Sequence, residues 1–349
     1  MIALDNIIRI NHESRIPKYL QIVNSIVENI GRNYLIVGEK IPSINEISEE
    51  FFLSRDTVEK AYNELKKRKI VSSVKGKGYY VARNVSHTQI KILFLLNKPS
   101  YYKLEIYNSF LNSLGDSATV DLNLYNCDPT ILTSILRENM GAYDYYVVMP
   151  HFKNDKQEHQ NENDAVLDVL NELPEDKLII MDNLLPSLCN NIASVCQDFK
   201  SDIYHALEEG SRNLVKYDKL ILVYPENVLY PYPQEIREGF KKFCSSYGFD
   251  SEVIPTIFPD MEFGSNDAYI TIEENDLVNL MRQIKDHGMQ LGKDVGVISY
   301  NDTPLKELLG ITVMSTDFKV MGETAAYMIK KGKSEQVKNV FNYIERGSI

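Results

Sequence analysis

Short apolar segments of β-strand length alternate with amphipathic helical segments from residue 90 to residue 299. The first pair is the almost wholly apolar run Ile90–Leu96 and the helical segment Leu104–Leu114. Strands of this kind are buried on both faces, and intervening helices make neighbouring strands parallel. The pattern predicts an α/β fold of parallel sheets with helices on both faces. Residues 90–349 are too many for one sheet, so we expect two lobes, with a ligand site between them at the carboxyl ends of the strands.

The N-terminal region has a different pattern, three helices followed by a hairpin. Residues 17–31 have the spacing of an amphipathic helix, and Ser43 with Glu46 forms a capping box for a second, short helix. Ser54 is placed to cap a third helix, whose apolar residues recur at i, i+3, i+4 and i+7. The sequence KGKG at 75–78 then forms a tight basic turn between two strands. This is the pattern of a winged helix-turn-helix domain.

The third helix and the hairpin have the charge distribution of a DNA-binding surface. The outward face of the helix is polar, and Lys75 and Lys77 lie at the tip of the hairpin. Such a surface suits a major groove and the phosphates beside it, although an ordinary helix and hairpin with solvated charges is the alternative. Residues 12–83 contain 13 Lys and Arg against 9 Asp and Glu, whereas the whole chain has a net charge of −11. A basic region on an acidic chain favours local binding of a polyanion.

The sequence from residue 16 to residue 81 resembles the GntR-family DNA-binding domain. The shared motifs are IPS at 41–43, SRxTV at 54–58 and the GxG wing at 76–78. The resemblance implies that the recognition helix and the wing contact DNA, and that operator DNA is the partner. Asn45 and Glu59 stand where the family often has Arg, so the operator of better-known members cannot be assumed. The predicted DNA-binding residues are Ser43, Asn45, Arg55, Asp56, Thr57, Lys60, Lys75, Gly76 and Lys77.

The C-terminal part resembles the effector domain of LacI-type repressors, which is itself similar to periplasmic sugar-binding proteins. Residues 274–309, 311–329 and 345–349 show this similarity most clearly, and residues 235–249 show it more weakly. Residues 90–190 match the family only in their alternation of strand and helix segments. We therefore expect a DNA-binding domain at residues 1–81, a polar linker at 82–89, and a two-lobed sugar-sensing and dimerisation domain at 90–349. The combination resembles the arabinose-responsive repressors of bacteria.

Polar side chains that follow predicted strands are the candidates for sugar binding. The resemblance places Asp198, Asn275 and Asn301 at the family's ligand-contact positions, whereas Asp276 and Asp302 are better explained as helix caps. Ile236 occupies the position of the family's sugar-binding Arg. Arg237 can therefore bind the sugar only if the alignment with the family shifts by one residue. Tyr101 and Tyr102 resemble an aromatic pair that closes on the ligand, with a core or interface role as the alternative. Asp182 and Asn183 are weaker candidates after another strand.

The sequence does not favour an enzyme. The 6 histidines are scattered without metal-ligand spacing, and no nucleophile elbow or phosphate-binding loop follows a strand. The polar stretch at residues 151–164 is expected to be a solvated loop. We predict no cofactor and no metal site. The 4 cysteines have no disulfide or CxxC spacing, and no signal peptide or membrane segment is recognisable, which indicates a cytoplasmic protein.

These observations lead to the hypothesis of a ligand-responsive, homodimeric transcription regulator. A monosaccharide bound between the lobes would change the geometry of the dimer, and with it the affinity for operator DNA. Two alternatives remain, in which the two-lobed body is an enzyme or serves only for dimerisation. The sequence does not indicate which sugar binds, whether it is phosphorylated, or whether the protein represses or activates.

Overall fold

The computed structural model describes residues 7–11, 14, 16–31, 34–82, 89–154, 156–188, 191–264 and 266–349. The chain divides into two compact units, Met1–Thr88 and Gln89–Ile349. The linker expected at residues 82–89 lies outside the described residues, apart from its first and last positions. Among the described helices, none is long and apolar enough to cross a membrane.

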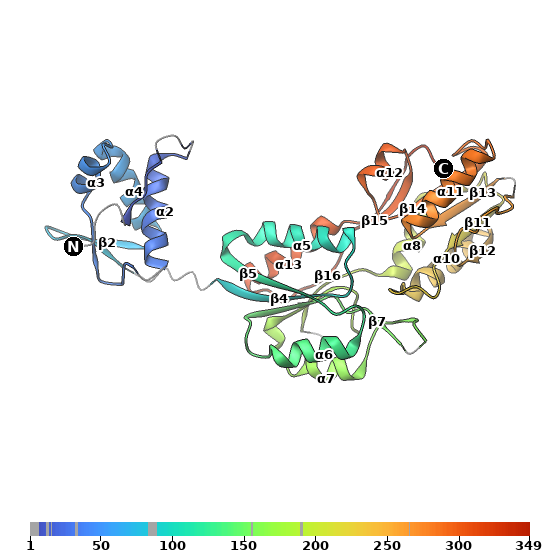
Figure 1. The fold of residues 1–349 in the computed structure, drawn as a ribbon, viewed down its shortest axis with the longest axis horizontal. Coiled ribbons are helices and arrows are strands. Elements are labelled where there is room, and N and C mark those ends of the chain that lie inside the picture. The colour runs from blue at the N-terminus through green and yellow to red at the C-terminus, as the bar shows by residue number, and fades with distance from the viewer. Residues whose placement is uncertain are drawn as a thin grey trace. The chain divides into compact units, whose positions relative to one another are not determined.

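The first unit packs its helices around one apolar core beside a small antiparallel sheet (Figure 1). Its sheet has the strand order β1-β3-β2, and its wing is the hairpin between β2 and β3. Ser43 and Glu46 form the predicted capping box, and Ser54 accepts a hydrogen bond from the Thr57 amide at 3.2 Å. The elements are α2 (Lys18–Gly31), β1 (Lys40–Ile41), α3 (Ile44–Glu50), α4 (Arg55–Lys67), β2 (Val71–Val74) and β3 (Gly78–Val81).

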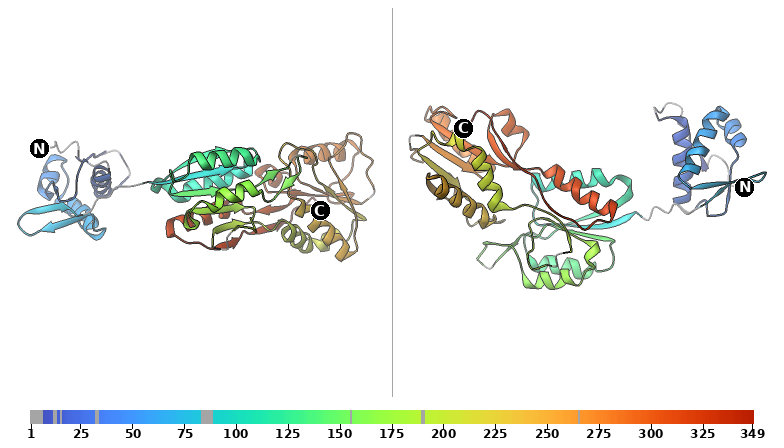
Figure 2. Two further views of the ribbon diagram at one scale, coloured as in Figure 1. Left: turned by 90° about the horizontal axis from the view of Figure 1, so that it is seen from below. Right: turned by 180° about the vertical axis from the view of Figure 1, so that it is seen from behind.

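The first lobe of the second unit is a six-stranded parallel sheet with the order β16-β10-β9-β6-β4-β5. Helices α5 and α13 cover one face and α6 and α7 the other (Figures 1 and 2). Gly322 of α13 lets the first pair approach closely, because a Cβ there would lie 2.3 Å from the Ile106 carbonyl oxygen. The elements are β4 (Ile90–Leu96), α5 (Tyr101–Leu114), β5 (Ala118–Leu124), α6 (Pro129–Glu138), β6 (Tyr145–Val148), α7 (Asp164–Asn171), β9 (Leu178–Asp182), β10 (Ala193–Cys196), α13 (Phe318–Lys331) and β16 (Gln336–Lys338).

The second lobe is a six-stranded sheet with the order β12-β11-β13-β14-β15-β17, parallel except for β17. Helices α8 and α10 pack on one face, and α11 packs on the other. The elements are α8 (Phe199–Glu209), α9 (Ser211–Leu214), β11 (Lys219–Val223), α10 (Gln234–Tyr247), β12 (Asp250–Ile254), β13 (Asp267–Thr271), α11 (Glu274–Asp286), β14 (Val295–Tyr300), α12 (Pro304–Leu308), β15 (Thr312–Thr316) and β17 (Phe341–Ile344).

The chain passes between the lobes three times, after β10, after β15 and after β16. The three crossings are tied to one another. The Asn339 amide donates to the Cys196 carbonyl at 2.8 Å, and the Asp317 amide donates to the Val340 carbonyl at 2.9 Å. The Thr316 hydroxyl donates to the side-chain oxygen of Gln197. The crossings therefore form one connected hinge rather than three independent strands.

The predicted fold class is confirmed: the chain has a winged helix-turn-helix domain and a two-lobed α/β body of parallel sheets. One expectation was wrong. The stretch 151–164 is not simply a solvated loop, because it contains the hairpin of β7 (Phe152–Lys153) and β8 (His159–Gln160). His151, Phe152 and His159 are buried. The polar composition concealed this, since the two buried histidines hydrogen-bond each other, and His151 also hydrogen-bonds Asp182.

Candidate functional site

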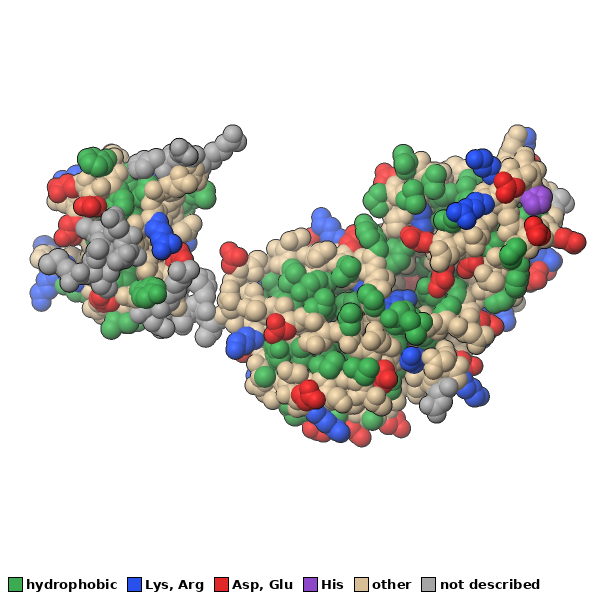
Figure 3. All heavy atoms as spheres, in the orientation of Figure 1, with side chains coloured by type: hydrophobic (Ala, Val, Ile, Leu, Met, Phe, Trp, Pro, Cys, Tyr) green, Lys and Arg blue, Asp and Glu red, His purple; other side chains and the backbone are tan. Residues whose placement is uncertain are grey.

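A cavity of about 150 Å³ lies between the two lobes of the second unit, with room for about five water molecules at the density of liquid water. It opens where carboxyl ends of parallel strands meet, as expected for this class of fold. Asn97 and Lys98 follow β4, Asp182 ends β9, and Asn301 follows β14. The surface is hollowed where the two lobes meet (Figure 3).

Two of these strand ends turn sharply at polar residues. Asp182 has φ of 72° and Asn301 has φ of 64°, so both lie in the left-handed region. Asp and Asn tolerate this conformation better than other side-chain-bearing residues. The Asn301 loop is held by the buried Lys306, whose ammonium donates to the Tyr300 carbonyl at 2.8 Å and to the Asn301 carbonyl at 3.0 Å. The turns carry both side chains into the cavity wall.

Asp182 is the centre of a buried polar network. Its side chain pairs with the Lys103 ammonium and accepts hydrogen bonds from Gln197 and, at 2.6 Å, from His151. Burial opposes the charged form of the Asp182 carboxyl, but the Lys103 charge and the hydrogen bonds outweigh burial and lower its pKa. Because Gln197 also binds Thr316, the network joins the cavity to two of the three crossings between the lobes.

His151 and His159 extend this network, and their hydrogen-bond partners define the tautomer of each ring. Burial, reinforced by nearby positive charge, lowers the pKa of His151, and burial lowers the pKa of His159 to about 2. Both rings are therefore neutral at pH 7. Because His151 Nε2 faces a carboxylate, it carries the proton and Nδ1 is the acceptor. His159 Nε2 must then donate to His151 Nδ1 across their 2.9 Å contact.

Lys98 is the other cation of the cavity wall, and it has no carboxylate partner within 4 Å among the residues that the structure describes. Its ammonium lies over two rings of the second lobe, 4.6 Å from the centre of Tyr232 and 5.8 Å from that of Tyr230. Burial lowers the pKa of Lys98, and the charge of Lys103 lowers it further. Lys98 is thus a half-buried positive charge facing the cavity.

Aromatic side chains form the apolar part of the wall. Tyr102 stacks on Phe318 with ring centres 5.2 Å apart, and Phe199, Tyr232 and Tyr300 also line the cavity. Several contacts join the two lobes around it: the Tyr102 hydroxyl approaches Glu274 at 3.4 Å, and the Tyr230 hydroxyl approaches Asn126 at 3.3 Å. The cavity is therefore a polar site with aromatic walls, enclosed by parts of both lobes.

Two buried polar atoms in the wall have no hydrogen-bond partner, the side-chain oxygen of Asn97 and the hydroxyl of Tyr300. A buried polar group without a partner costs about 1–3 kcal/mol, so such groups are uncommon in folded proteins. Both atoms have almost no accessible surface, so a ligand in the cavity does not reach them in this arrangement of the wall. They therefore do not by themselves indicate a binding site.

Of the six main ligand candidates, Tyr102 and Asn301 line the cavity, and so does the weaker candidate Asp182. The other four main candidates lie outside its described wall. Tyr101 and Asn275 are exposed, and Asp198 caps α8 by accepting from the Ser201 amide at 3.0 Å. Ile236, not Arg237, faces the cavity, so the register does not shift.

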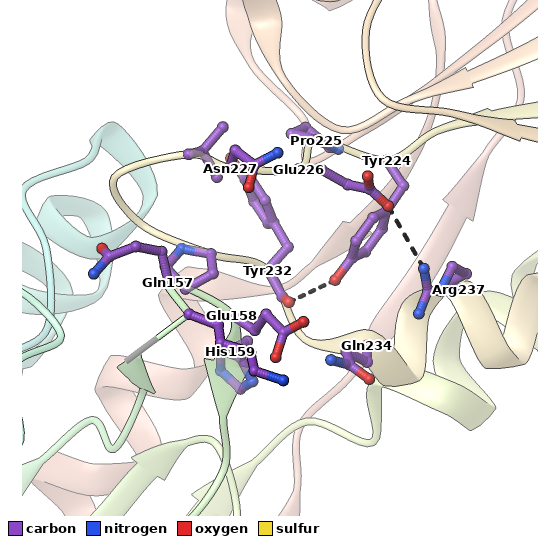
Figure 4. A pocket seen from close by; sticks show the side chains of 13 residues that line it. Gln157, Glu158, His159, Tyr224, Pro225, Glu226, Asn227, Tyr232, Gln234 and Arg237 are labelled. Atoms are coloured by element: carbon purple, nitrogen blue, oxygen red, sulfur yellow. Dashed lines mark hydrogen bonds and ion pairs between the residues drawn. The ribbon is translucent and has the colours of Figure 1, made fainter. Parts of the chain in front are cut away.

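Arg237 lines a second pocket instead (Figure 4). Its guanidinium lies 3.7 Å from a Glu226 carboxylate oxygen and 5.6 Å from the centre of the Tyr224 ring. His159 comes from the β7–β8 hairpin of the first lobe and lines the same pocket, whose other wall contains Tyr232. Since Tyr232 also lines the main cavity, the two pockets adjoin there.

The expectation that Asp276 and Asp302 cap helices was wrong. Asp276 accepts from the Thr256 hydroxyl and the Ile257 amide, both at 2.8 Å, and so holds the loop after β12. Asp302 forms a bidentate pair with Arg346 at 2.9 and 2.8 Å. Sequence spacing could not show these partners. The two partners of Asp276 lie 20 and 19 residues away from it, and Arg346 lies 44 residues away from Asp302.

The predicted DNA-binding residues lie on α3, α4 and the wing of the first unit. Asn45, Arg55, Asp56, Lys75 and Lys77 are exposed, and Gly76 turns the wing with φ of 77°. Ser43 and Thr57 are partly engaged in helix caps. The Lys60 ammonium lies 4.3 Å from the centre of the Tyr19 ring, so it is held against α2. The turn between α3 and α4 also exposes 93% of Phe52, which the sequence did not single out.

Several cavity residues escaped sequence reasoning: Lys98, Lys103, His151, Gln197 and Tyr232. Lys98 had a usable signal, since it is the second residue after the first predicted strand of the body. His151 and Tyr232 lie in irregular segments whose position depends on the tertiary fold. Among the described residues, no group of His, Cys, Asp and Glu is arranged to hold a metal ion.

Two family matches cover separate parts of the chain. Residues 18–81 match the bacterial regulatory proteins of the gntR family, and residues 214–349 match the periplasmic binding protein-like domain. The transcriptional repressor YtrA of Bacillus subtilis is 31% identical over 84 residues, which are 24% of this chain and 65% of YtrA. The arabinose metabolism transcriptional repressor of Geobacillus stearothermophilus is 37% identical over 78 residues, 22% of this chain and 21% of that repressor. The chain thus spans less than two thirds of these relatives.

The body is similar to solved structures of regulators. A LacI family transcriptional regulator from Lactobacillus casei, solved with bound glucose, has a TM-score of 0.57 and 12% identity. The alignment covers 74% of this chain and 99% of that regulator, and at this identity it shows the fold alone. Both resemblances found in the sequence are confirmed: the chain joins a GntR-type helix-turn-helix domain to a periplasmic-binding-protein-like domain.

Proposed function

We propose that this protein is a transcription regulator whose affinity for operator DNA is set by a monosaccharide or sugar derivative in the cavity between the lobes. The carrying observation is the cavity itself, which combines aromatic walls with convergent polar groups. The DNA-binding half of the proposal is supported by the exposed basic wing and the gntR-family match. We propose that it acts in the cytoplasm, where its DNA target lies.

The hinge offers a route from cavity to DNA. Gln197 lies on the first crossing and binds both Asp182 of the cavity and Thr316 of the second crossing. A ligand that contacts Asp182 or Lys103 therefore interacts differently with different lobe arrangements. That difference in binding free energy is what a ligand needs to shift a conformational equilibrium. Tyr102 and Asn301 complete the proposed contacts, one from each lobe.

A gel-shift titration on operator DNA, with a panel of free and acidic sugars, tests this function. An effector should change the operator Kd by about 5- to 150-fold, the range of typical allosteric coupling. Asn301→Ala should weaken the response while leaving sugar-free DNA affinity unchanged. Asn275→Ala is the matched control, because Asn275 follows the neighbouring strand but lies outside the described cavity wall. Sugar turnover would favour an enzyme, and no response to any sugar would favour a purely dimerising body.

We also propose that the regulator is a homodimer, formed through exposed apolar residues on α5 and α12 of the second unit. Leu305 and Leu308 on α12 are 59% and 82% exposed, and Leu104 on α5 is 43% exposed. Hydrophobic side chains are visible over both helices in Figure 3. Exposed apolar patches of this kind are typical of protein contacts.

Leu308→Glu should raise the dimer Kd by at least about 30-fold, because a carboxylate would be desolvated in the contact. Sedimentation velocity measures the change. Val215→Glu is the control, since Val215 is 71% exposed but lies after α9, on another part of the lobe. A monomeric wild-type protein, or equal dimerisation of both variants, would contradict this assignment.

A further inference from the structure

The charged residues of the cavity wall give information about the charge of the ligand, which the fold alone does not specify. Among the described residues that line the cavity, the bases are Lys98 and Lys103 and the only acid is Asp182. His151 is neutral at pH 7, because burial lowers its pKa. The wall therefore has a net charge of about +1. This is unusual in a chain whose net charge is −11, so general basicity does not explain it.

The two lysines have different electrostatic environments. Lys103 is 8% exposed and is fully compensated by its ion pair with Asp182. Lys98 lies over the faces of Tyr230 and Tyr232 and has no ion pair within 4 Å among the described residues, although Glu273 and Asp182 attract its charge from a longer distance. Cation–π contacts contribute less than an ion pair with good hydrogen bonds. Lys98 is thus the lysine of the described cavity wall that has no ion pair.

Other groups near Lys98 can also bind negative charge. Ser100, which lines the cavity, is the N-cap of the 14-residue helix α5, so the positive end of this helix faces the same wall. A half-buried ammonium and a helix N-terminus together form a site for an anionic oxygen group.

We infer that the effector is a sugar derivative with one anionic oxygen group, and that Lys98 binds this group. The inference rests on the proposed function and narrows it from sugars in general to sugar acids and sugar phosphates. Carboxylate and phosphate ester share the chemistry that Lys98 and the end of α5 recognise. The aromatic rings of Tyr102 and Tyr232 and the amide of Asn301 remain for the sugar itself.

The test compares sugars that share a carbon skeleton and differ in charge. Isothermal titration calorimetry on the full chain, at constant ionic strength, would use arabinose, arabinonate and arabinose 5-phosphate, and then glucose, gluconate and glucose 6-phosphate. At least one anionic member should bind about tenfold tighter or more than its neutral parent, as expected for a charge-assisted hydrogen bond. Comparing the affinities of the sugar acids with those of the sugar phosphates then shows whether the site prefers a carboxylate or a phosphate group.

Lys98→Met should abolish this preference, so that the anionic sugar binds no tighter than its neutral parent. Lys91→Met is the matched control, because Lys91 is exposed on the same strand region and lies outside the described cavity wall. Lys98→Gln provides a second variant if the Met variant is poorly folded. Equal binding of neutral and anionic sugars by the wild type, or an unchanged preference in Lys98→Met, would overturn the inference. The proposed regulatory function would survive that result.

A separate measurement with inorganic phosphate makes the two proposals distinguishable. Phosphate should raise the Tm of the wild-type protein and of Lys91→Met, relative to chloride at equal ionic strength, but not that of Lys98→Met. If no sugar binds but phosphate stabilises through Lys98, the sugar half of the proposed function fails and the anion site stands. If phosphate has no Lys98-dependent effect and no anionic sugar is preferred, the anion site fails.

Discussion

Asp182→Ala should lower the free energy of unfolding of the second unit by about 3–5 kcal/mol, the cost of removing one partner from a buried ion pair. The carboxylate is 2% exposed, and its removal leaves the buried Lys103 ammonium without a counter-charge. His151 Nε2 and the Gln197 amide would also lose their acceptor. Urea denaturation followed by far-ultraviolet circular dichroism measures the change, with the first unit's transition as an internal reference.

Asp176→Ala is the matched control, since Asp176 precedes the same strand and is exposed. Its effect should stay within about 0.5 kcal/mol. A double-mutant cycle with Lys103→Met isolates the pair. The two single losses of unfolding free energy should add up to about 1–3 kcal/mol more than the loss in the double variant. The reason is that the double variant contains no buried ammonium without a counter-charge. Additive effects, or equal stability of Asp182→Ala and Asp176→Ala, would mean that the pair does not stabilise the fold.

The stability difference should also depend on pH. The pKa of the Asp182 carboxyl is lower in the folded protein than its ordinary value of about 3.9. A lowered carboxyl pKa stabilises the folded state above the unfolded pKa, and this contribution disappears as the pH falls through the folded pKa. The difference between wild type and Asp182→Ala should therefore be constant near neutral pH and shrink below about pH 4.

Most of the fold was predictable because hydrophobic periodicity is a local property. The expected strand Ile90–Leu96 has the bounds of β4, and the expected helix Leu104–Leu114 matches α5 except that α5 begins at Tyr101. The break between α8 and the short α9 at Gly210 was not predictable in the same way. A Cβ at Gly210 would meet the Tyr343 ring at 2.6 Å, a tertiary contact that no local pattern reveals.

The site was less predictable, because it depends on which strand ends meet and how each side chain is oriented. Strand-end position identified Asn301 correctly as a cavity-lining residue, yet the same rule selected Asp198, which caps a helix. The Asp182 network has partners 31 and 79 residues apart in sequence, so only the assembled sheet brings them together. The family resemblance could not identify Lys98 as a site residue, because the region around it matches the family only in its alternation of strands and helices.

Arg55→Ala should weaken binding to specific operator DNA by about 1–3 kcal/mol, or roughly 5- to 150-fold in Kd, the range for one bidentate contact with guanine. Arg55 is the first residue of α4 and is exposed, and it has no ion-pair partner among the described residues. The operator can be selected from a random duplex library with the wild-type protein. Fluorescence anisotropy then compares the operator with a scrambled duplex of equal length.

Two further variants separate loss of base readout from loss of charge. Arg68→Ala removes the same charge at the other end of α4, where Arg68 pairs with Glu64 at 2.8 Å, and should leave operator preference intact. Lys77→Ala, at the exposed wing, should weaken both duplexes alike and reduce the salt slope by about one unit. Only Arg55→Ala should lower the ratio of specific to scrambled affinity. If Arg55→Ala keeps that ratio, the first residue of α4 does not read bases, and readout must come from Thr57, Asn45 or the exposed Phe52 at the turn.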